Sequence, residues 1–323
     1  MANYTNRITS PVMTLSRRLF AVLVTAVAMP ISCLPLWAAE ATLQGQSRIP
    51  SYHIPHTGKQ LVIDGVFAAI GRMLVSFARF PQITKANVSE LRTSWSWSLP
   101  NGPNEGTPLF HDGVLFVHAY GDKVQALDAV TGDLLWQYNR RLPQGTPISV
   151  KRSIALYGDK VFTGTSDTHV VALDAKTGRV VWDSPVAAQK EGFGLTGGVT
   201  VAKGKVIAST TGRAPGGNFI VAFDVNTGKE AWRFNTIPRE NEPGGNTWNG
   251  VPYNQRNGGS VWTPGTYDAS TNLLYFGVAQ TYDTGPYRNL KAGENNDLLY
   301  TDATIALNPD TGKLVWHFQH QPN

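Results

Sequence analysis

Short runs of alternating apolar and polar residues recur through the last two thirds of the chain. One such run, Val170 to Asp174, is followed by a polar turn and a second apolar run that ends at Trp182. Side chains of a β-strand point alternately to opposite faces, so these runs predict strands rather than helices. Further strands are expected upstream of the turns, each beginning at a glycine: Gly113, Gly158 and Gly204. The pattern predicts an all-β protein.

The polar turns between these strands share one sequence pattern: an Asp or Asn, two residues, Thr-Gly, three residues and Trp. Four copies occur, at 128–136, 174–182, 224–232 and 308–316. In the second copy, the Asp174 carboxylate is suited to accept backbone N–H groups of the turn, and Gly178 supplies the positive φ that closes the hairpin. We expect the Trp of each copy to fill the wedge between neighbouring units.

The spacing of the copies predicts the architecture. The first three copies are about 45 to 50 residues apart with several short strands between them, which is typical of a four-stranded propeller blade. We therefore predict a β-propeller with Trp-docking repeats, of which about four to five blades are present in this chain. Residues 235–307 contain an insertion rich in Pro, Gly and Asn. Long loops on a regular scaffold are where function concentrates.

The N-terminal segment predicts export. A basic stretch ends at Arg17 and Arg18, an apolar run extends to Met29, and small residues follow at Ala38 and Ala39. These are the parts of a secretory signal peptide, so we assign 1–39 to a signal peptide, 40–82 to an N-terminal extension and 83–323 to the partial propeller. A transmembrane anchor is the alternative, but the apolar run is shorter than the roughly 20 residues of a spanning helix. The arginine pair also resembles a twin-arginine signal, which would export a folded protein.

Composition and charge narrow the class further. The 323 residues are 41% apolar and 16% charged, which excludes a disordered or coiled-coil protein. The formal charge of +5 falls to +2 without the first 39 residues, which hold three arginines and no acid. We therefore expect no nucleic-acid partner. The single cysteine, Cys33, lies in the predicted signal peptide, so residues 40–323 can form no disulfide or Cys-rich metal site.

The repeats and the segments between them resemble the pyrroloquinoline quinone (PQQ)-dependent alcohol and methanol dehydrogenases. The resemblance begins with 83–95, which is similar to the family's lead-in to the first blade, and continues to the last residue. It implies an eight-bladed propeller that oxidises an alcohol or related hydroxylated substrate in the periplasm and passes electrons to a cytochrome c or a membrane quinone. It also implies no stable membrane span after signal cleavage. Outer-membrane assembly propellers share the repeat, so the loop residues discriminate better.

Six loop positions match cofactor contacts of the family. Glu105 matches a glutamate that contacts the quinone, and Arg152 matches an arginine that reaches a PQQ carboxylate, as its planar charged fork suits. Trp262 matches the indole that forms the floor under the quinone. The residues that the resemblance assigns to PQQ are Glu105, Arg152, Thr196, Thr211, Ser260 and Trp262. The alternatives are an interblade role for Trp262, a surface ion pair for Arg152, and turn or strand hydrogen bonds for Glu105, Thr196 and Thr211.

Other positions depart from the family. Thr146 and Pro147 stand where active members carry the disulfide that covers the quinone, and Ala214 aligns with the calcium-ligating glutamate. Gln280 aligns with the calcium-ligating asparagine, so it is the one metal ligand that the resemblance predicts, for Ca²⁺ or another metal. Arg213 is a candidate to supply positive charge in place of a metal.

The catalytic residue is not assigned. In the family an aspartate takes the proton of the substrate hydroxyl, and its match is expected a few residues beyond Asn323. Two alternatives to a working enzyme therefore stay open. One is a non-catalytic propeller that binds or scaffolds another protein, and the other is an inactive truncated fragment of a quinoprotein dehydrogenase.

Overall fold

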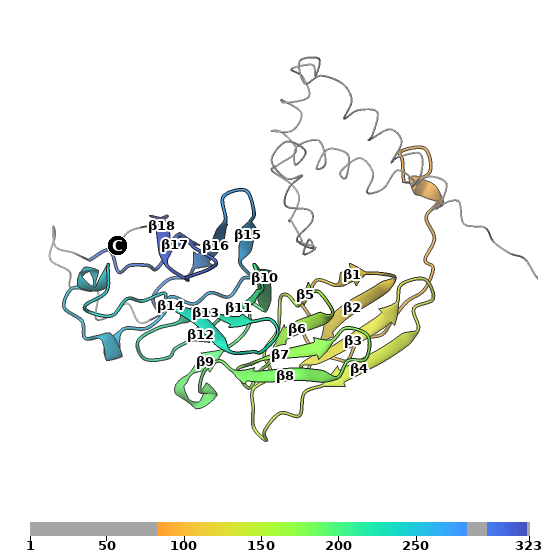
Figure 1. Cartoon of the computed structure of the whole chain (residues 1–323), viewed down its shortest axis with the longest axis horizontal. Helices are drawn as coiled ribbons and strands as arrows, with labels where there is room; N and C mark the ends of the chain where they lie inside the picture. Colours follow the sequence, from red (N-terminus) through yellow and green to blue (C-terminus); the bar gives the residue numbers. More distant parts are fainter. Residues whose placement is uncertain (1–82, 283–295, 322–323) are drawn as a thin grey trace, which may run out of the picture. The chain divides into compact units, whose positions relative to one another are not determined.

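The computed structural model describes residues 83–282 and 296–321 (Figure 1). The predictions for the signal peptide at 1–39 and the extension at 40–82 lie outside these residues. The described strands all belong to one compact unit of the chain. Among the described residues, no helix has the length and apolarity needed to cross a membrane.

Sixteen of the strands form four antiparallel sheets of four strands each, and each sheet keeps its strands in chain order. The first sheet consists of β1 (Leu109–His111), β2 (Val114–Ala119), β3 (Lys123–Asp128) and β4 (Leu134–Asn139). The second consists of β5 (Ala155–Tyr157), β6 (Lys160–Gly164), β7 (His169–Asp174) and β8 (Val180–Pro185). The third consists of β10 (Val199–Ala202), β11 (Lys205–Ser209), β13 (Phe219–Asp224) and β14 (Glu230–Asn235). The fourth consists of β15 (Thr266–Asp268), β16 (Leu273–Val278), β17 (Ala303–Leu307) and β18 (Leu314–Gln319).

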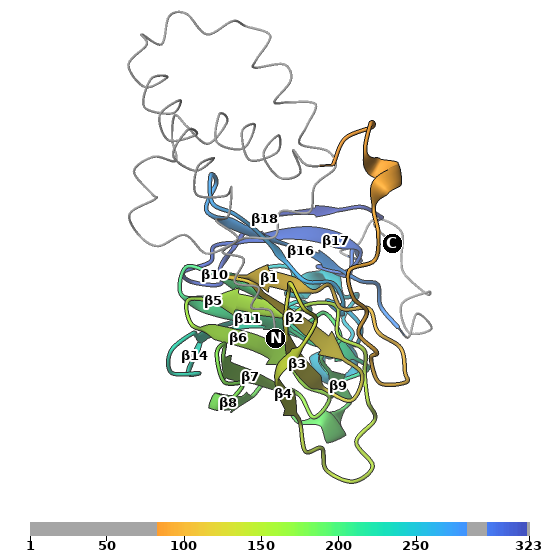
Figure 2. The same cartoon turned by 90° about the vertical axis from the view of Figure 1, so that its right-hand side faces the viewer.

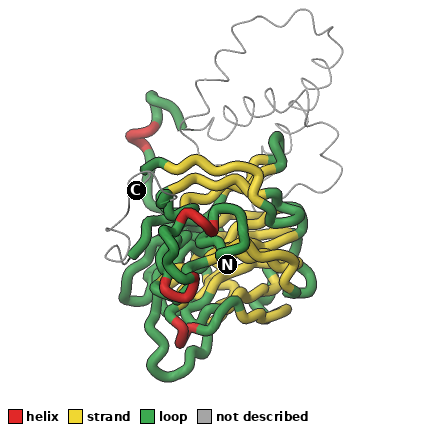
Figure 3. Tube along the Cα trace, turned by 90° about the vertical axis from the view of Figure 1, so that its left-hand side faces the viewer, coloured by secondary structure: helices red, strands yellow, loops and turns green. Residues whose placement is uncertain are grey.

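Short elements complete the described part. A separate two-stranded ladder pairs β9 (Phe193–Gly194) with β12 (Thr211–Gly212). The helical elements are single 3₁₀ turns, seen in Figure 3 as small red segments: η2 (Val88–Glu90), η3 (Gln189–Glu191), η4 (Gly245–Thr247) and η5 (Tyr253–Gln255). The all-β prediction and the four-stranded unit are therefore confirmed.

The hydrophobic runs are buried because consecutive sheets pack face to face. In β7, Val171 and Leu173 enter a core shared with the first sheet, whereas Val170 and Ala172 enter a core shared with the third. Alternate side chains of this strand thus fill two different cores, so the run is apolar at every position from Val170 to Leu173. The expected alternation of apolar and polar residues is wrong for this strand, although the strand itself is confirmed. A third core joins the third and fourth sheets. β10, the first strand of the third sheet, lies against β5 (Figure 2) and β15 (Figure 1), the first strands of the second and fourth sheets.

The Trp residues of the first three repeats each dock on the Thr-Gly turn of the next sheet. The indole N–H groups of Trp136, Trp182 and Trp232 donate to backbone carbonyls in the following turn, at 3.0, 3.0 and 2.9 Å. Trp95, which precedes the first sheet, makes the equivalent bond to Ala129 at 3.2 Å. The predicted wedge role of these residues is confirmed.

The turn itself explains the rest of the repeat. Asp174 Oδ1 accepts hydrogen bonds from the backbone N–H groups of Lys176 and Thr177 and from the Thr177 hydroxyl, which lower the pKa of this carboxyl. Gly178 has φ +69°. A Cβ at Gly178 would lie 2.7 Å from Cδ2 of Trp136 and closer still to its Cε3. Glycine is therefore required twice, for the backbone angle and for the indole that rests on it.

Candidate functional site

Most of the predicted site residues occupy equivalent places in the four sheets. Glu105, Arg152, Thr196 and Trp262 each lie on the loop that leads into the first strand of a sheet, which is β1, β5, β10 and β15 respectively. Because β10 lies against β5 and β15, the loops that precede these three strands lie close together, and the contact of Glu105 with Arg152 brings the loop before β1 to the same place. The fold therefore brings together side chains that are far apart in the sequence.

The four residues make direct contacts centred on Arg152. Its Nη2 lies 2.6 Å from Oε2 of Glu105, and its Nη1 donates to the backbone carbonyl of Thr196 at 3.3 Å. The guanidinium carbon lies over the Trp262 ring, 5.0 Å from its centroid. We call Glu105, Arg152, Thr196 and Trp262 the arginine cluster. The sequence placed all four in one site, and the structure brings them into contact.

The arginine cluster is open to solvent. The side chains of Arg152 and Glu105 are 24% and 47% exposed, and Trp262 is 49% exposed. An ion pair this exposed contributes at most about 1 kcal/mol to stability, and an exposed indole forgoes most of its burial energy. Fold stability therefore does not explain the arrangement, whereas an anionic, planar ligand would use both the charge and the ring face.

Thr211 and Ser260 lie in the layer that supports the Trp262 segment. Ser260 is fully buried, and its hydroxyl oxygen accepts hydrogen bonds from the Gly212 N–H at 3.1 Å and from the Tyr282 hydroxyl at 2.6 Å. The Val261 N–H donates to the Thr210 carbonyl at 3.1 Å, and Thr211 is 9% exposed. The resemblance assigned both residues to the cofactor, and in the structure the Ser260 hydroxyl accepts these hydrogen bonds from within the protein.

Two glycines that the sequence left without a role allow the close approach of the loops. A Cβ on Gly197 would lie 3.2 Å from the Val261 carbonyl oxygen. Gly198 has φ +81°, and a Cβ there would lie 2.5 Å from the backbone nitrogen of Ser153. Ser153 adds a hydrogen bond from its hydroxyl to the Val199 carbonyl at 2.8 Å. The loop of Thr196 is thus packed directly on the loops of Arg152 and Trp262.

The positions that the resemblance links to calcium do not lie among clustered carboxylates in the described residues. Gln280 is exposed, and its backbone carbonyl accepts the Gly259 N–H at 3.1 Å. Ala214 is fully buried and offers no ligand, whereas Arg213 stacks over the Tyr282 ring at 5.2 Å. Within residues 83–282 and 296–321, no three His, Cys, Asp or Glu side chains gather closely enough to hold a metal ion. Calcium prefers six to eight oxygens, with carboxylates among them.

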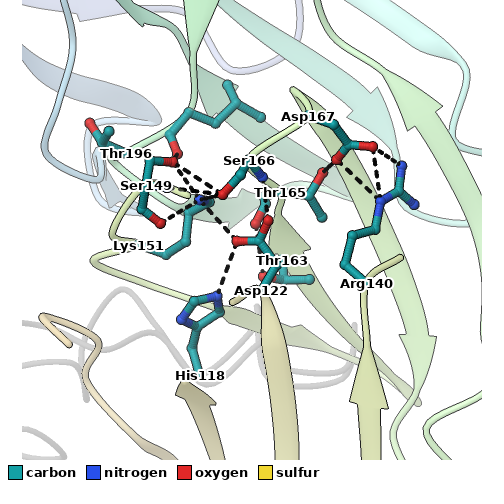
Figure 4. A network of polar contacts seen from close by, with 12 residues as sticks. His118, Asp122, Arg140, Ser149, Lys151, Thr163, Thr165, Ser166, Asp167 and Thr196 are labelled. Atoms are coloured by element: carbon teal, nitrogen blue, oxygen red, sulfur yellow. Dashed lines mark hydrogen bonds and ion pairs between the residues drawn. The ribbon is translucent and has the colours of Figure 1, made fainter. Parts of the chain in front are cut away.

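A buried polar network beside the arginine cluster was missed by sequence reasoning (Figure 4). Lys151 and Asp122 are 1% exposed, and Lys151 Nζ lies 3.1 Å from Asp122 Oδ1. Burial lowers the pKa of Lys151 and opposes the attraction of Asp122. His118 lies 4.0 Å from the same oxygen, and burial lowers its pKa from 6.5 to about 4, so it is neutral at pH 7. No sequence spacing pairs Lys151 with Asp122, because Asp122 lies in the turn between β2 and β3 of the first sheet and Lys151 lies on the loop before β5 of the second.

A hollow is lined by residues other than those of the arginine cluster. It has a volume of about 270 Å³ and is lined by residues that include Phe193, Phe219, Arg233, Arg239 and Tyr253. Arg233 is already engaged, since it stacks on Phe219 at 3.9 Å and pairs with Glu230 at 2.7 Å. None of the residues predicted to contact PQQ lines this hollow.

Comparison with known proteins agrees with the geometry. Residues 73–321 match the family model described as PQQ, the β-propeller domain of glucose, ethanol and alcohol dehydrogenases. The quinohemoprotein alcohol dehydrogenase ADH IIB of Pseudomonas putida is 38% identical, over 76% of this chain and 38% of the relative. The quinoprotein alcohol dehydrogenase PedH of Pseudomonas putida is 34% identical, over 95% of this chain and 53% of the relative.

A solved structure described as a europium-containing methanol dehydrogenase matches with a TM-score of 0.66. It is 28% identical, over 75% of this chain and 46% of the other. This chain thus spans between about two fifths and about half of the length of these relatives. The match covers the four sheets and the loops that carry the arginine cluster, and on that basis the chain belongs to the family of PQQ-dependent alcohol dehydrogenase β-propellers.

Proposed function

We propose that this chain acts in the PQQ-dependent oxidation of an alcohol or related hydroxylated substrate in the periplasm, with electrons passing to a cytochrome c or a membrane quinone. The observation that carries the proposal is the arginine cluster, in which loops of four sheets bring one guanidinium onto an exposed indole. The names of the relatives support the substrate class and the quinone cofactor.

The residues of the arginine cluster suit PQQ, a planar tricyclic quinone with three carboxylates. Trp262 offers a large, rigid face for stacking, and Arg152 offers a charged fork for a carboxylate. Such a carboxylate would compete with Glu105 for Arg152, and the quinone would share the Trp262 ring face with the guanidinium that lies over it. When bound, the quinone supplies the oxidising chemistry, and the protein supplies orientation and electrostatics.

Two hydroxyl-bearing residues complete the proposed binding surface. Thr196 already contributes its backbone carbonyl to Arg152, and Thr211 lies in the strand that pairs with Gly194. We assign their hydroxyls to hydrogen bonds with the cofactor. Ser260 acts through Trp262, because its bonds to Gly212 and Tyr282 fix the segment that carries the indole.

The alternative function is a propeller that binds a ligand or a protein without turnover. Its support is the buried Ala214 and the exposed Gln280, which leave the described residues without the ligands that a calcium ion needs. A cation that polarises the quinone carbonyl is part of the family's chemistry, so its absence would uncouple binding from oxidation. A propeller that binds the cofactor without turnover would share PQQ binding with the dehydrogenase, whereas a scaffold for another protein would need neither PQQ nor catalysis.

The test is a titration of the purified chain with PQQ, with and without Ca²⁺ or a lanthanide, followed by tryptophan fluorescence and by dye-linked alcohol oxidation. Trp262→Ala is expected to abolish most of the PQQ-dependent quenching. Trp316→Ala is the matched control, because Trp316 is 41% exposed and lies outside the arginine cluster. Saturable binding with oxidation supports the dehydrogenase, and binding without oxidation supports a propeller that binds the cofactor without turnover. No saturable binding refutes both of these and leaves the scaffold for another protein as the alternative.

A further inference from the structure

A buried ammonium group lies immediately beside the arginine cluster (Figure 4). Lys151 Nζ donates to Ser149 Oγ at 2.7 Å and to Ser166 Oγ at 3.1 Å, and it lies 3.1 Å from Asp122 Oδ1. The Lys151 side chain is 0% exposed and that of Asp122 is 1% exposed. We call Lys151, Asp122, Ser149 and Ser166 the buried anchor.

The buried anchor joins two neighbouring sheets. Asp122 lies in the turn between β2 and β3 of the first sheet, and Ser166 lies in the turn between β6 and β7 of the second. Asp122 Oδ2 also accepts the backbone N–H of Ser166. One carboxylate therefore binds both the adjacent turn and the lysine, and it fixes the lysine relative to both sheets.

The backbone of Lys151 reaches both members of the Arg152–Glu105 pair. Arg152 follows Lys151 directly in sequence. The carbonyl oxygen of Lys151 would lie 3.5 Å from a Cβ placed on Gly106, the residue after Glu105. On the other side of Arg152, the Ser153 hydroxyl is bonded to the Val199 carbonyl at 2.8 Å. The Arg152 backbone is thus held on both sides, and Lys151 provides one of the two attachments.

The choice of a charged residue here is not explained by stability. A buried ion pair contributes little net stability, because removing both charges from water offsets their attraction, and an apolar pair of similar volume would serve as well. What a buried anchor held by several hydrogen bonds and an ion pair adds is a single defined geometry. That property is useful beside a binding residue whose position must be fixed.

We propose that the Lys151–Asp122 pair is a positioning element for Arg152, which sets the guanidinium between Glu105, the Thr196 carbonyl and Trp262. The benefit of a fixed Arg152 rests on the proposed function, whereas the contacts of Lys151 and Asp122 do not depend on it. Lys151 and Asp122 act through Arg152 and do not themselves touch a ligand.

The first test needs no cofactor. The labelling rate of Arg152 by phenylglyoxal is measured by peptide mass spectrometry in the full chain, with Arg233 as the reference within each digest. The variants are Lys151→Met and the double variant Lys151→Met/Asp122→Asn, which leaves no unpaired buried charge and keeps an acceptor for Ser166. Loosening of the loop is expected to raise the Arg152 rate about threefold or more in both.

The control variant is Arg140→Met. Arg140 joins the same two sheets through Asp167 at 2.7 Å but touches neither Arg152 nor Lys151. It reports the effect of weakening the sheet-to-sheet contact alone, so the labelling rate of Arg152 should match the wild type. An unchanged Arg152 rate in the double variant overturns the proposal, and so does an equal rise in Arg140→Met.

The second test is PQQ affinity, measured on the same three variants and the wild type. A displaced Arg152 is expected to raise the dissociation constant about tenfold in both Lys151 variants and not in Arg140→Met. Equal affinity in all four proteins overturns the positioning role. If the wild type binds no PQQ, the proposed function fails, whereas the labelling rates still decide whether Lys151 positions Arg152.

Discussion

Docking of Trp136 on Gly178 can be separated from the backbone requirement at that turn by two glycine substitutions in the second sheet. Gly178 and Gly158 both close hairpins with positive φ, +69° and +58°. A Cβ on Gly178 would lie 2.7 Å from Cδ2 of Trp136, whereas one on Gly158 would have no heavy atom within 4 Å. Gly158→Ala therefore measures the cost of the backbone angle, and Gly178→Ala measures that cost plus the loss of docking.

The structure gives the size of the difference. An alanine in the left-handed region costs about 1 kcal/mol at either position. At Gly178 the indole must also move by about 1 Å to reach an ordinary carbon–carbon separation. That shift breaks the Trp136 N–H bond to the Ala175 carbonyl, which is worth about 1 kcal/mol, and overpacks the boundary by about 1–3 kcal/mol. We expect Gly158→Ala to lose about 1 kcal/mol and Gly178→Ala about 3–5 kcal/mol.

The assay is equilibrium unfolding in urea, with tryptophan fluorescence and far-ultraviolet circular dichroism followed on the same samples. The midpoint of Gly178→Ala should fall well below that of Gly158→Ala, with the order repeated in thermal midpoints. Equal losses in the two variants would refute the idea that the indole, rather than the turn alone, demands glycine.

Three further predictions concern the polar contacts. Arg140→Met should lower the free energy of unfolding by about 2–3 kcal/mol, because it leaves Asp167 without its partly buried partner. Lys160→Met removes an exposed ion pair with Asp159 and should lower the free energy of unfolding by at most about 1 kcal/mol. Urea unfolding of both variants compares the two losses. His118 has a folded-state pKa of about 4 against 6.5 unfolded, so the unfolded chain binds the proton first and stability should fall, by roughly 3 kcal/mol in all, as pH drops from 6.5 to 4. His118→Gln should flatten that stretch of the urea-midpoint profile, and an unchanged slope would contradict the assignment. Ser260→Ala should lower the free energy of unfolding by about 1–3 kcal/mol, since it leaves buried hydrogen-bond donors without an acceptor. Thermal unfolding measures the change, and an unchanged midpoint would contradict this role of the hydroxyl.

The repeats could be predicted from sequence because their physics is local. Asp174 and Gly178 act within one turn, and their roles follow from residue type and spacing. The second role of Gly178, to carry an indole, could not be predicted in the same way, because the indole belongs to the preceding sheet. Local patterns identify the turn, whereas the packing partner is known only once the sheets are placed side by side.

In the candidate site, too, some residues could be predicted from the sequence and others only from the placing of the sheets. The resemblance to a family supplied Glu105, Arg152 and Trp262, and the structure brings them into contact. It also assigned the Ser260 hydroxyl to the cofactor, although bonds to the surrounding loops occupy it. Lys151 was passed over because a lysine in a loop is ordinarily exposed, and its buried partner Asp122 comes from a different sheet. Tertiary contacts of this kind leave no periodic signal in the chain.

The most direct test of the central claim is a double-mutant cycle on PQQ affinity between Arg152 and Trp262. The two side chains touch each other, so their contributions to the binding of one ligand should be coupled. Arg152→Met and Trp262→Ala are each predicted to raise the dissociation constant about tenfold or more, and the double variant to raise it by less than the product of the two. Wild-type affinity in either single variant would contradict the claim that these residues form the PQQ site.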